Sequence, residues 1–200
     1  MASSIRLPKV DVDLRPLFKG EERGHRRKDM IVLHETVSSN RPGLRDITSP
    51  AEYLDANGLE IHGVIDQEGY VGWAYDPTAI YDHAASGNGR VNSRSVGFEL
   101  VSEIPFLGTV TERRRAWKKP DRVKQLDTVA AWCAYLHVEL GIPLDYSDAT
   151  TPGITSHWDV SRSWLNGHGH WDCWPIHRGG HFPLNYVVYK ARQIVAAADA

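Results

Sequence analysis

Three short apolar runs constrain the fold of this chain more than any other feature. They cover residues 30–34 (MIVLH), 95–101 (SVGFELV) and 154–157 (ITSH). Short apolar runs bounded by polar residues are typical of buried strands. Residues 61–75 add two apolar segments on either side of a glycine-containing turn, a pattern that predicts a β-hairpin. The chain is therefore expected to contain a sheet.

A first helix is predicted over residues 48–58 (TSPAEYLDANG). Ser49 can cap its amino end, Pro50 suits the first helical position, and Glu52 completes a capping box. Gly58 is a suitable terminator, because glycine readily adopts the left-handed backbone conformation that ends many helices.

Two further helices are predicted in the second half of the chain. Residues 121–141 place apolar side chains at helical spacing, with Asp121 as the expected cap and Gly141 as the terminator. Residues 184–198 have the same kind of spacing and predict a closing helix. Residues 112–121 (ERRRAWKKPD) are strongly basic and are predicted to form a surface loop.

The order of these elements is strand, helix, hairpin, strand, helix, strand, helix. It predicts an α/β fold in a single domain, with a central mixed β-sheet flanked by α-helices. Residues 1–29 are predicted to be an irregular N-terminal segment, followed by one domain over residues 30–200, since 200 residues suit a single domain. Ligands at the ends of different strands are expected to converge at one edge of the sheet.

Composition limits the possible binding partners of the chain and the cellular compartment in which it is made. A formal net charge of −2 gives no broad attraction to nucleic acid or to an anionic membrane. Two cysteines, Cys133 and Cys173, do not make a disulfide framework and indicate synthesis in a reducing compartment. The N-terminus has no apolar run typical of a signal peptide, and no stretch is long enough to span a membrane. We expect a monomer that is made in the cytoplasm and does not insert into membranes.

Residue types that bind metals are concentrated in residues 156–173 (SHWDVSRSWLNGHGHWDC). His157 ends one predicted strand, and His34 ends another in the same way. Neutral imidazole is the commonest protein ligand for zinc, although a histidine at a strand end also occurs without any metal. The remaining histidines are expected to have other roles: core for His137, solvent for His25, a surface turn for His177 and His181, and a cleft lining for His62 and His83.

Several motifs, in their order, resemble the type 2 N-acetylmuramoyl-L-alanine amidases, which include phage lysozyme-type amidases, bacterial autolysins and recycling amidases, and the related peptidoglycan recognition proteins. The motifs are IVLHET, IHGVIDQEGYVGWAYD, NSRSVGFELV, ITSHWDV and HGHWDCWP, and they lie within residues 30–175. The run NSRSVGFEL is similar to the family's Asn-x-x-Ser-Ile-Gly-Ile-Glu-Leu. The resemblance implies that residues 30–200 are a zinc amidase catalytic domain, with the zinc cleft at one edge of the sheet.

The resemblance also implies a set of zinc ligands. His34 matches the family's first ligand and His157 its second, and Asp172 matches the third. The chain departs from the family in two ways: the usual Asp-Pro-Gly is replaced by Asp-Cys-Trp-Pro, and the segment before it is longer. Cys173 therefore stays an alternative third ligand, and His168 is an extra histidine that is expected to lie outside the ligand set.

Residues for catalysis follow from the same resemblance. Glu99 matches a carboxyl group that serves as acid and base, whereas Ile61 stands where other members have a tyrosine with that role. A carboxyl group in an apolar strand has a raised pKa if it is buried, which suits proton transfer. His170 matches a donor to the oxyanion of the tetrahedral intermediate. The resemblance further suggests substrate contacts by His62, His83 and Asn92.

The implied activity is hydrolysis of the amide bond between N-acetylmuramic acid and L-alanine in peptidoglycan. A phage endolysin that acts on the cell wall after release is the expected setting. Two alternatives are a peptidoglycan-binding module without catalysis and a cytoplasmic amidase that recycles muropeptides. The run HETVS after residue 33 has no second histidine, which argues against a zinc peptidase of the HExxH type.

Overall fold

The computed structural model describes residues 5–18, 26–36, 47–74, 76–80, 83–84, 90–165, 170 and 172–200. Its centre is a six-stranded sheet in the order β1-β4-β3-β5-β2-β6. The strands are β1 (Val12–Asp13), β2 (Met30–Glu35), β3 (Gly63–Ile65), β4 (Val71–Trp73), β5 (Ser95–Leu100) and β6 (Gly153–Ser156). Only the β3–β4 pair is antiparallel among these strands. The prediction of a single α/β domain with a mixed sheet is confirmed.

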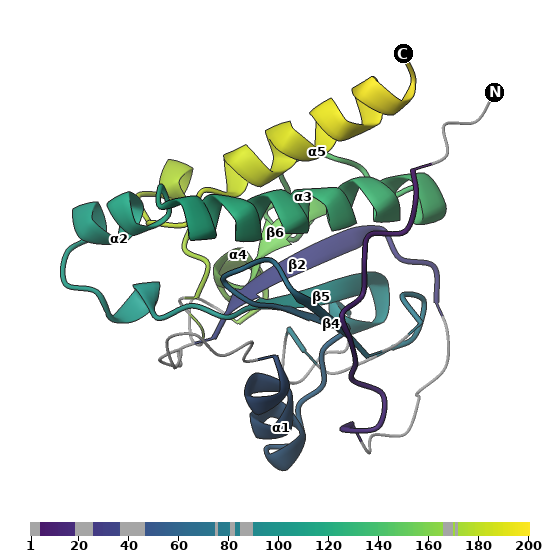
Figure 1. Ribbon diagram of the computed structural model, residues 1–200, viewed down its shortest axis with the longest axis horizontal. Helices are drawn as coiled ribbons and strands as arrows, with labels where there is room; N and C mark the ends of the chain where they lie inside the picture. The colour runs from purple at the N-terminus through teal and green to yellow at the C-terminus, as the bar shows by residue number, and fades with distance from the viewer. Residues whose placement is uncertain are drawn as a thin grey trace.

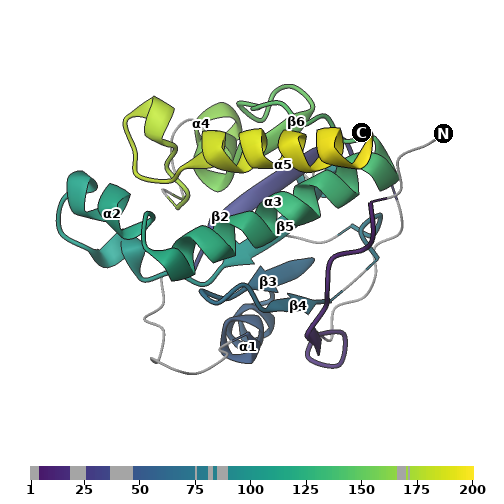
Figure 2. The same cartoon turned by 45° about the horizontal axis from the view of Figure 1, so that its top comes forward.

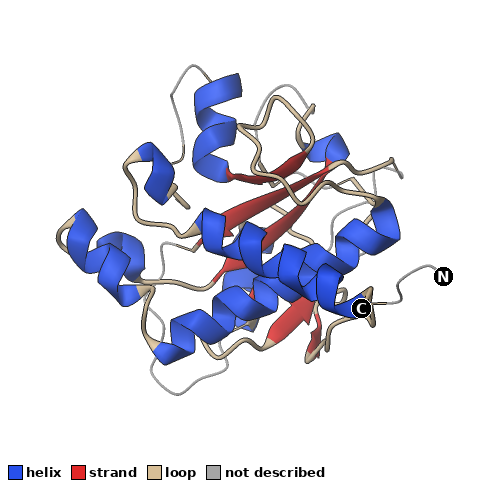
Figure 3. Ribbon diagram, turned by 90° about the horizontal axis from the view of Figure 1, so that it is seen from above, coloured by secondary structure: helices blue, strands red, loops and turns tan. Residues whose placement is uncertain are grey.

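Five α-helices surround the sheet in the described part of the chain. They are α1 (Thr48–Ala56), α2 (Val110–Ala116), α3 (Pro120–Leu140), α4 (His157–Trp164) and α5 (Leu184–Ala198). Short 3-10 turns lie at η1 (Asn92–Arg94), η2 (Ile104–Phe106) and η3 (Ile176–Arg178). Helices α3 and α5 lie side by side over one face of the sheet, and α1 lies on the opposite side (Figure 1, Figure 2). Seen from above, two long helices lie in front of the strands (Figure 3).

Strand β2 shows how the sheet separates its two faces. Ile31 and Leu33 belong to the large core cluster that also contains residues of α3 and α5. Met30 and Val32 pack on the other face, against Val160 of α4. Because successive side chains of a strand point to opposite faces, the next residues along β2 also separate. His34 therefore shares the face of Met30 and Val32, whereas Glu35 shares the face of the large core.

Helix ends agree with the sequence prediction at glycines and differ from it at the caps. Gly141 ends α3 in the left-handed conformation, with φ of 71°, as predicted. The predicted cap Ser49 is wrong, because Ile47 precedes α1 and no side chain caps it. The predicted cap Asp121 is also wrong: Pro120 occupies the first turn of α3, where its missing N–H costs no helical hydrogen bond.

Two helices were not predicted. The basic stretch that begins at Glu112, expected to be a loop, starts within α2 and ends within α3. Helix α2 begins with a capping box between Thr109 and Glu112. His157 does not end a strand but opens α4, and Ser156 caps that helix by accepting a hydrogen bond from the backbone N–H of Asp159. Both helices have only seven or eight residues, which is too short for a clear helical period.

The N-terminal segment contributes to the sheet. Strand β1 runs parallel to β4, with Val12 opposite Gly72 and Asp13 opposite Trp73. The following Leu14 is fully buried in a cluster with Ile47. The segment expected to be irregular therefore contains one edge strand, which two residues are too few to reveal by pattern. Among the described helices, none combines the length and the apolar character needed to cross a membrane.

Candidate functional site

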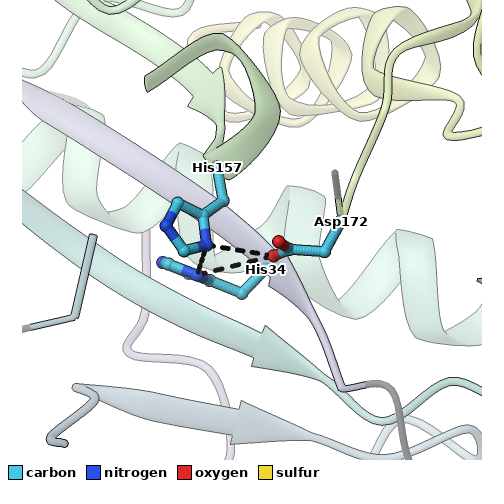
Figure 4. Close-up of side chains that lie close together, drawn as sticks. All are labelled: His34, His157 and Asp172. Carbon is cyan, nitrogen blue, oxygen red and sulfur yellow. Dashed lines mark hydrogen bonds and ion pairs between the residues drawn. The ribbon is translucent and has the colours of Figure 1, made fainter. Parts of the chain in front are cut away.

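Three side chains from distant parts of the chain meet at the carboxyl end of the parallel strands. His34 lies near the end of β2, His157 opens α4, and Asp172 lies in the loop that follows (Figure 4). The two Nδ1 atoms are 2.9 Å apart, and Asp172 Oδ2 lies 3.2 Å from Nδ1 of His157 and 3.7 Å from Nδ1 of His34. All three residues are buried. The residues predicted as metal ligands are thus brought together by the fold.

The sheet register explains why the two histidines are neighbours. Strands β2 and β6 are parallel and adjacent, with Leu33 opposite Ser156. The next residue of each chain segment is a histidine, so both rings leave the sheet at the same level. Ser156 then turns the chain into α4: its hydroxyl donates to Asp159 Oδ2 (2.7 Å) and accepts from the backbone N–H of Asp159 (3.1 Å).

The charges of the group suit a cation. Burial opposes ionisation of Asp172, but the nearby rings of His157 and His34 outweigh it and lower the pKa of the carboxyl to about 2. Burial lowers the pKa of His34 well below its ordinary value, so that ring is neutral at pH 7. Metal ligands must be free of protons at the coordinating atom. An ionised carboxylate and a neutral imidazole meet this condition without further proton loss.

The alternative third ligand, Cys173, lies outside this group. Within the described residues, His34, His157 and Asp172 offer donor atoms that lie within 4.8 Å of one another, and Cys173 is not part of this group. Burial, and then Glu35, raise the pKa of its thiol well above the ordinary value. A thiol binds metals as the thiolate. The geometry thus favours Asp172 as the third donor.

Glu99 lies beside the group in the sheet. It is paired in register with His34 on the neighbouring strand, so both side chains extend from the same face. Its exposed fraction is 8%. Burial, together with Asp172 and Glu35, raises the pKa of its carboxyl well above the ordinary value. Glu99 is therefore able to hold or release a proton at a pH closer to neutrality than a free carboxyl group.

His170 lies at the solvent side of the group. Its ring stacks on that of His157, with centroids 4.0 Å apart, and its Nδ1 is 3.7 Å from Asp172 Oδ1. The side chain is 61% exposed. Partial burial and the neighbouring His157 lower its pKa, so it is a neutral donor at pH 7. His168 lies outside the described residues.

The three residues expected to contact substrate all have protein partners. His62 is fully buried; its Nδ1 accepts from the backbone N–H of Gly97 (3.1 Å), and its Nε2 faces the carbonyl of Ala79 (3.2 Å). Asn92 is buried and accepts from the backbone N–H of Ala84 (2.8 Å). His83 lies against the ring of His34. Substrate contact by these residues stays a prediction, and this geometry does not favour it.

Sequence reasoning missed Glu35 and misplaced His181. Both side chains have no exposed surface, and His181 Nε2 lies 2.9 Å from Glu35 Oε2. The prediction of a surface turn at His181 is therefore wrong. The carboxylate of Glu35 also accepts from the backbone N–H of Cys173 (2.8 Å) and from the hydroxyl of Ser102 (3.3 Å). Glu35 thus connects the end of β2 to the loop that carries Asp172.

The fold of the chain is similar to that of several solved structures. One is the Staphylococcus aureus hydrolase AmiA in complex with its ligand, with 16% identity, a TM-score of 0.65, and coverage of 96% of this chain and 87% of that chain. Another is the endolysin N-acetylmuramoyl-L-alanine amidase LysCS from Clostridium intestinale URNW, with 19% identity, a TM-score of 0.57, and coverage of 96% and 99%. A third is the catalytic domain of PlyG, with 12% identity, a TM-score of 0.58, and coverage of 92% and 93%.

Sequence comparison assigns the family. No curated protein sequence matches the chain. A family description does match: N-acetylmuramoyl-L-alanine amidase, over residues 24–175. This match covers more than half of the chain and contains the sheet edge at which His34, His157 and Asp172 meet. The chain therefore belongs to the N-acetylmuramoyl-L-alanine amidase family of peptidoglycan amidases.

Proposed function

We propose that this chain is a zinc-dependent amidase that hydrolyses the bond between N-acetylmuramic acid and L-alanine, and that it acts as a monomeric endolysin. The observation that carries the zinc dependence is the buried group of His34, His157 and Asp172. The endolysin role is supported by similarity to structures such as LysCS, which is itself described as an endolysin. Peptidoglycan is the substrate, and the enzyme acts on the cell wall after release from the cytoplasm.

The donor set fits zinc in type and in spacing. Two imidazole nitrogens and one carboxylate oxygen are ligands that zinc takes in catalytic sites, where three protein ligands leave one position open. Ligands about 2.0–2.1 Å from a tetrahedral ion lie roughly 3.3–3.4 Å from one another. The three separations of 2.9, 3.2 and 3.7 Å fall on both sides of that value. When bound, zinc supplies a Lewis acid that polarises the amide carbonyl and activates water at neutral pH.

The remaining steps belong to protein side chains. Glu99 accepts a proton from the attacking water and passes it to the leaving amine of L-alanine, so that one carboxyl group serves as base and then as acid. His170, at the exposed side of the group, donates a hydrogen bond to the oxygen that becomes negative in the tetrahedral intermediate. A donor in such a position lowers the activation free energy by about 3 kcal/mol.

Metal analysis tests the ligand assignment. We expect about one zinc per wild-type chain, and loss of zinc in the separate variants His34→Ala, His157→Ala and Asp172→Ala. The matched control is Cys173→Ala, which is expected to keep its zinc because the thiol lies outside the donor group. Full occupancy in all three ligand variants would contradict the assignment. Zinc loss in Cys173→Ala, with retention in Asp172→Ala, would make Cys173 the third ligand.

Product analysis tests the bond that is cleaved. Purified sacculi treated with the enzyme are expected to gain N-terminal L-alanine without new reducing sugar ends, and a chelator is expected to stop the reaction. New reducing ends without new alanine would show a glycosidase instead. Assays on intact sacculi and on soluble muropeptides address the setting: an endolysin cleaves sacculi, whereas strong preference for soluble muropeptides would indicate a recycling amidase.

A further inference from the structure

His83 takes part in a chain of polar contacts that begins at the first candidate ligand. Its Nδ1 lies 3.2 Å from Nε2 of His34, and its Nε2 lies 3.0 Å from the hydroxyl oxygen of Ser95. The Ser95 hydroxyl lies 2.7 Å from the backbone carbonyl of Val91. The contacts start on the side of the His34 ring that faces away from the candidate metal site and end at a backbone acceptor.

The hydrogens of this chain can be assigned from its far end. A carbonyl has no proton to give, so the Ser95 hydroxyl donates to Val91 and its oxygen accepts from Nε2–H of His83. A neutral ring carries one N–H, which leaves Nδ1 of His83 as an acceptor. Nε2 of His34 therefore donates to His83, and Nδ1 of His34 carries the free lone pair.

The free lone pair on Nδ1 of His34 faces the other two candidate ligands. Nδ1 of His34 is the atom that lies 2.9 Å from Nδ1 of His157 and 3.7 Å from Asp172. A ligating histidine commonly donates its other N–H to a neighbouring acceptor, which sets its tautomer and the orientation of its ring. The acceptor is usually a carboxylate, a carbonyl or water, whereas here it is a second imidazole.

We propose that His83 is a positioning residue: it accepts the Nε2 proton of His34, and Ser95 in turn orients His83, so that Nδ1 of His34 is presented to the metal. This inference rests on the proposed zinc site. It changes the expected role of His83 from substrate contact to support of a ligand, since both of its ring nitrogens are engaged by the protein.

Packing around His83 supports this role. The ring stands edge-on to His34, with centroids 5.4 Å apart, and edge-on to His62, with centroids 5.5 Å apart. Gly97 packs against the His83 ring: a Cβ added at Gly97 would come within 2.5 Å of Nδ1 of His83. Glycine at this position of β5 therefore leaves space for the His83 ring beside His34.

Zinc affinity provides the first test, measured on the full chain by competition with a fluorescent chelator. We expect His83→Leu to weaken zinc binding about 10–100-fold, the usual effect of removing a partner of a ligating histidine. His83→Asn keeps an acceptor oxygen near the position of Nδ1 and is expected to recover most of the affinity. The control is His137→Leu: His137 lies in α3, and its ring faces the carbonyl of Ile142, which follows that helix.

The outcomes separate this inference from the proposed function. Absence of zinc from the wild type would contradict both the proposed zinc dependence and the positioning role of His83. Zinc in the wild type, with unchanged affinity in His83→Leu, would overturn the positioning role alone. Equal losses in His83→Leu and His83→Asn would show that packing, and not the acceptor, is what matters.

A second measurement needs no variant of His83. Nitrogen-15 NMR of the metal-free wild type distinguishes the two neutral tautomers of each histidine ring. We expect both His34 and His83 to carry the proton on Nε2. A proton on Nδ1 of His83 would reverse the direction of the contacts and overturn the inference, whatever the affinity of the variants.

Discussion

Glu99 occupies a position that a carboxyl group rarely takes without a functional reason. It is buried in the sheet, and burial together with the negative charges of Asp172 and Glu35 disfavours its ionised form. At pH values above the ordinary pKa of a carboxyl group, the buried Glu99 therefore lowers the stability of the folded state. A raised pKa brings the group closer to the range in which an acid–base catalyst both gains and loses protons.

The residue-scale prediction concerns Glu99→Gln. The amide keeps the size of the side chain but accepts no proton, so kcat is expected to fall about 10²–10⁴-fold while zinc content stays unchanged. A base must be ionised to act, so wild-type activity is expected to rise with pH along a limb above pH 4.5, the ordinary value. That limb is expected to disappear in the variant. Near wild-type kcat would place the base elsewhere, with Glu60 as the next candidate.

At the scale of elements, the site depends on where parallel strands end. Strands β2 and β6 bring His34 and His157 to one level, and β5 adds Glu99. The third donor comes from a loop, and a loop position needs an anchor. Glu35 supplies it through the backbone N–H of Cys173, together with the buried His181. Two donors are thus held by the sheet, and Asp172 is held by a buried hydrogen-bond network.

The element-scale prediction concerns β1, which lies at the edge of the sheet. Leu14 has no exposed surface and packs in a cluster with Ile47 and Val64. Leu14→Ala is expected to lower the free energy of unfolding by about 2–5 kcal/mol, as for other buried leucines. Urea denaturation measures the change. The control is Leu7→Ala at a position that is 57% exposed, where about 0.5 kcal/mol or less is expected.

The same comparison decides where the domain begins. If Leu14→Ala is as stable as the wild type, the N-terminal segment does not contribute to the folding unit, and the boundary at residue 30 predicted from sequence is preferable. If the loss is found, the segment that contains β1 belongs to the same cooperative unit as the sheet. Zinc content is expected to be unaffected in either variant, because β1 and the candidate ligands lie at different parts of the sheet.

At the scale of the whole molecule, Lys28 is an unusual cation. Its exposed fraction is 1%, and its ammonium group lies 3.4 Å from the backbone carbonyls of Asn92 and Ser93. Burial, partly offset by Asp76, lowers its pKa to about 8 from an ordinary value of 10.5. The folded chain therefore releases this proton at a lower pH than the unfolded chain does.

The whole-molecule prediction follows from that difference. Between pH 8 and 10.5 the unfolded state binds more protons at Lys28, so the contribution of this residue to stability increases with pH. From pH 7 to 10 the wild type is expected to gain about 2–3 kcal/mol relative to Lys28→Met. Denaturation of the metal-free protein at several pH values measures this gain, with the exposed Lys118→Met as a matched control. A difference that does not change with pH would contradict the lowered pKa.

Local sequence pattern determined much of the fold. Short apolar runs located β2, β5 and β6, and helical spacing located α3 and α5. These predictions succeed because side-chain periodicity and turn chemistry act over a few residues along the chain. The same patterns were too short to reveal β1, α2 and α4. The candidate ligands His34, His157 and Asp172 came from the family resemblance and not from local pattern, and the fold brings their donor atoms close together.

The tertiary structure alone decided which polar groups face one another. Nothing local to His181 indicates that it is buried against Glu35, and nothing local to His83 indicates that it lies between His34 and Ser95. Each of these contacts joins residues at least twelve positions apart, and most join residues on different elements. Burial and hydrogen bonding depend on how the sheet and helices pack together, and that packing places the partners of a polar side chain far from it in the sequence.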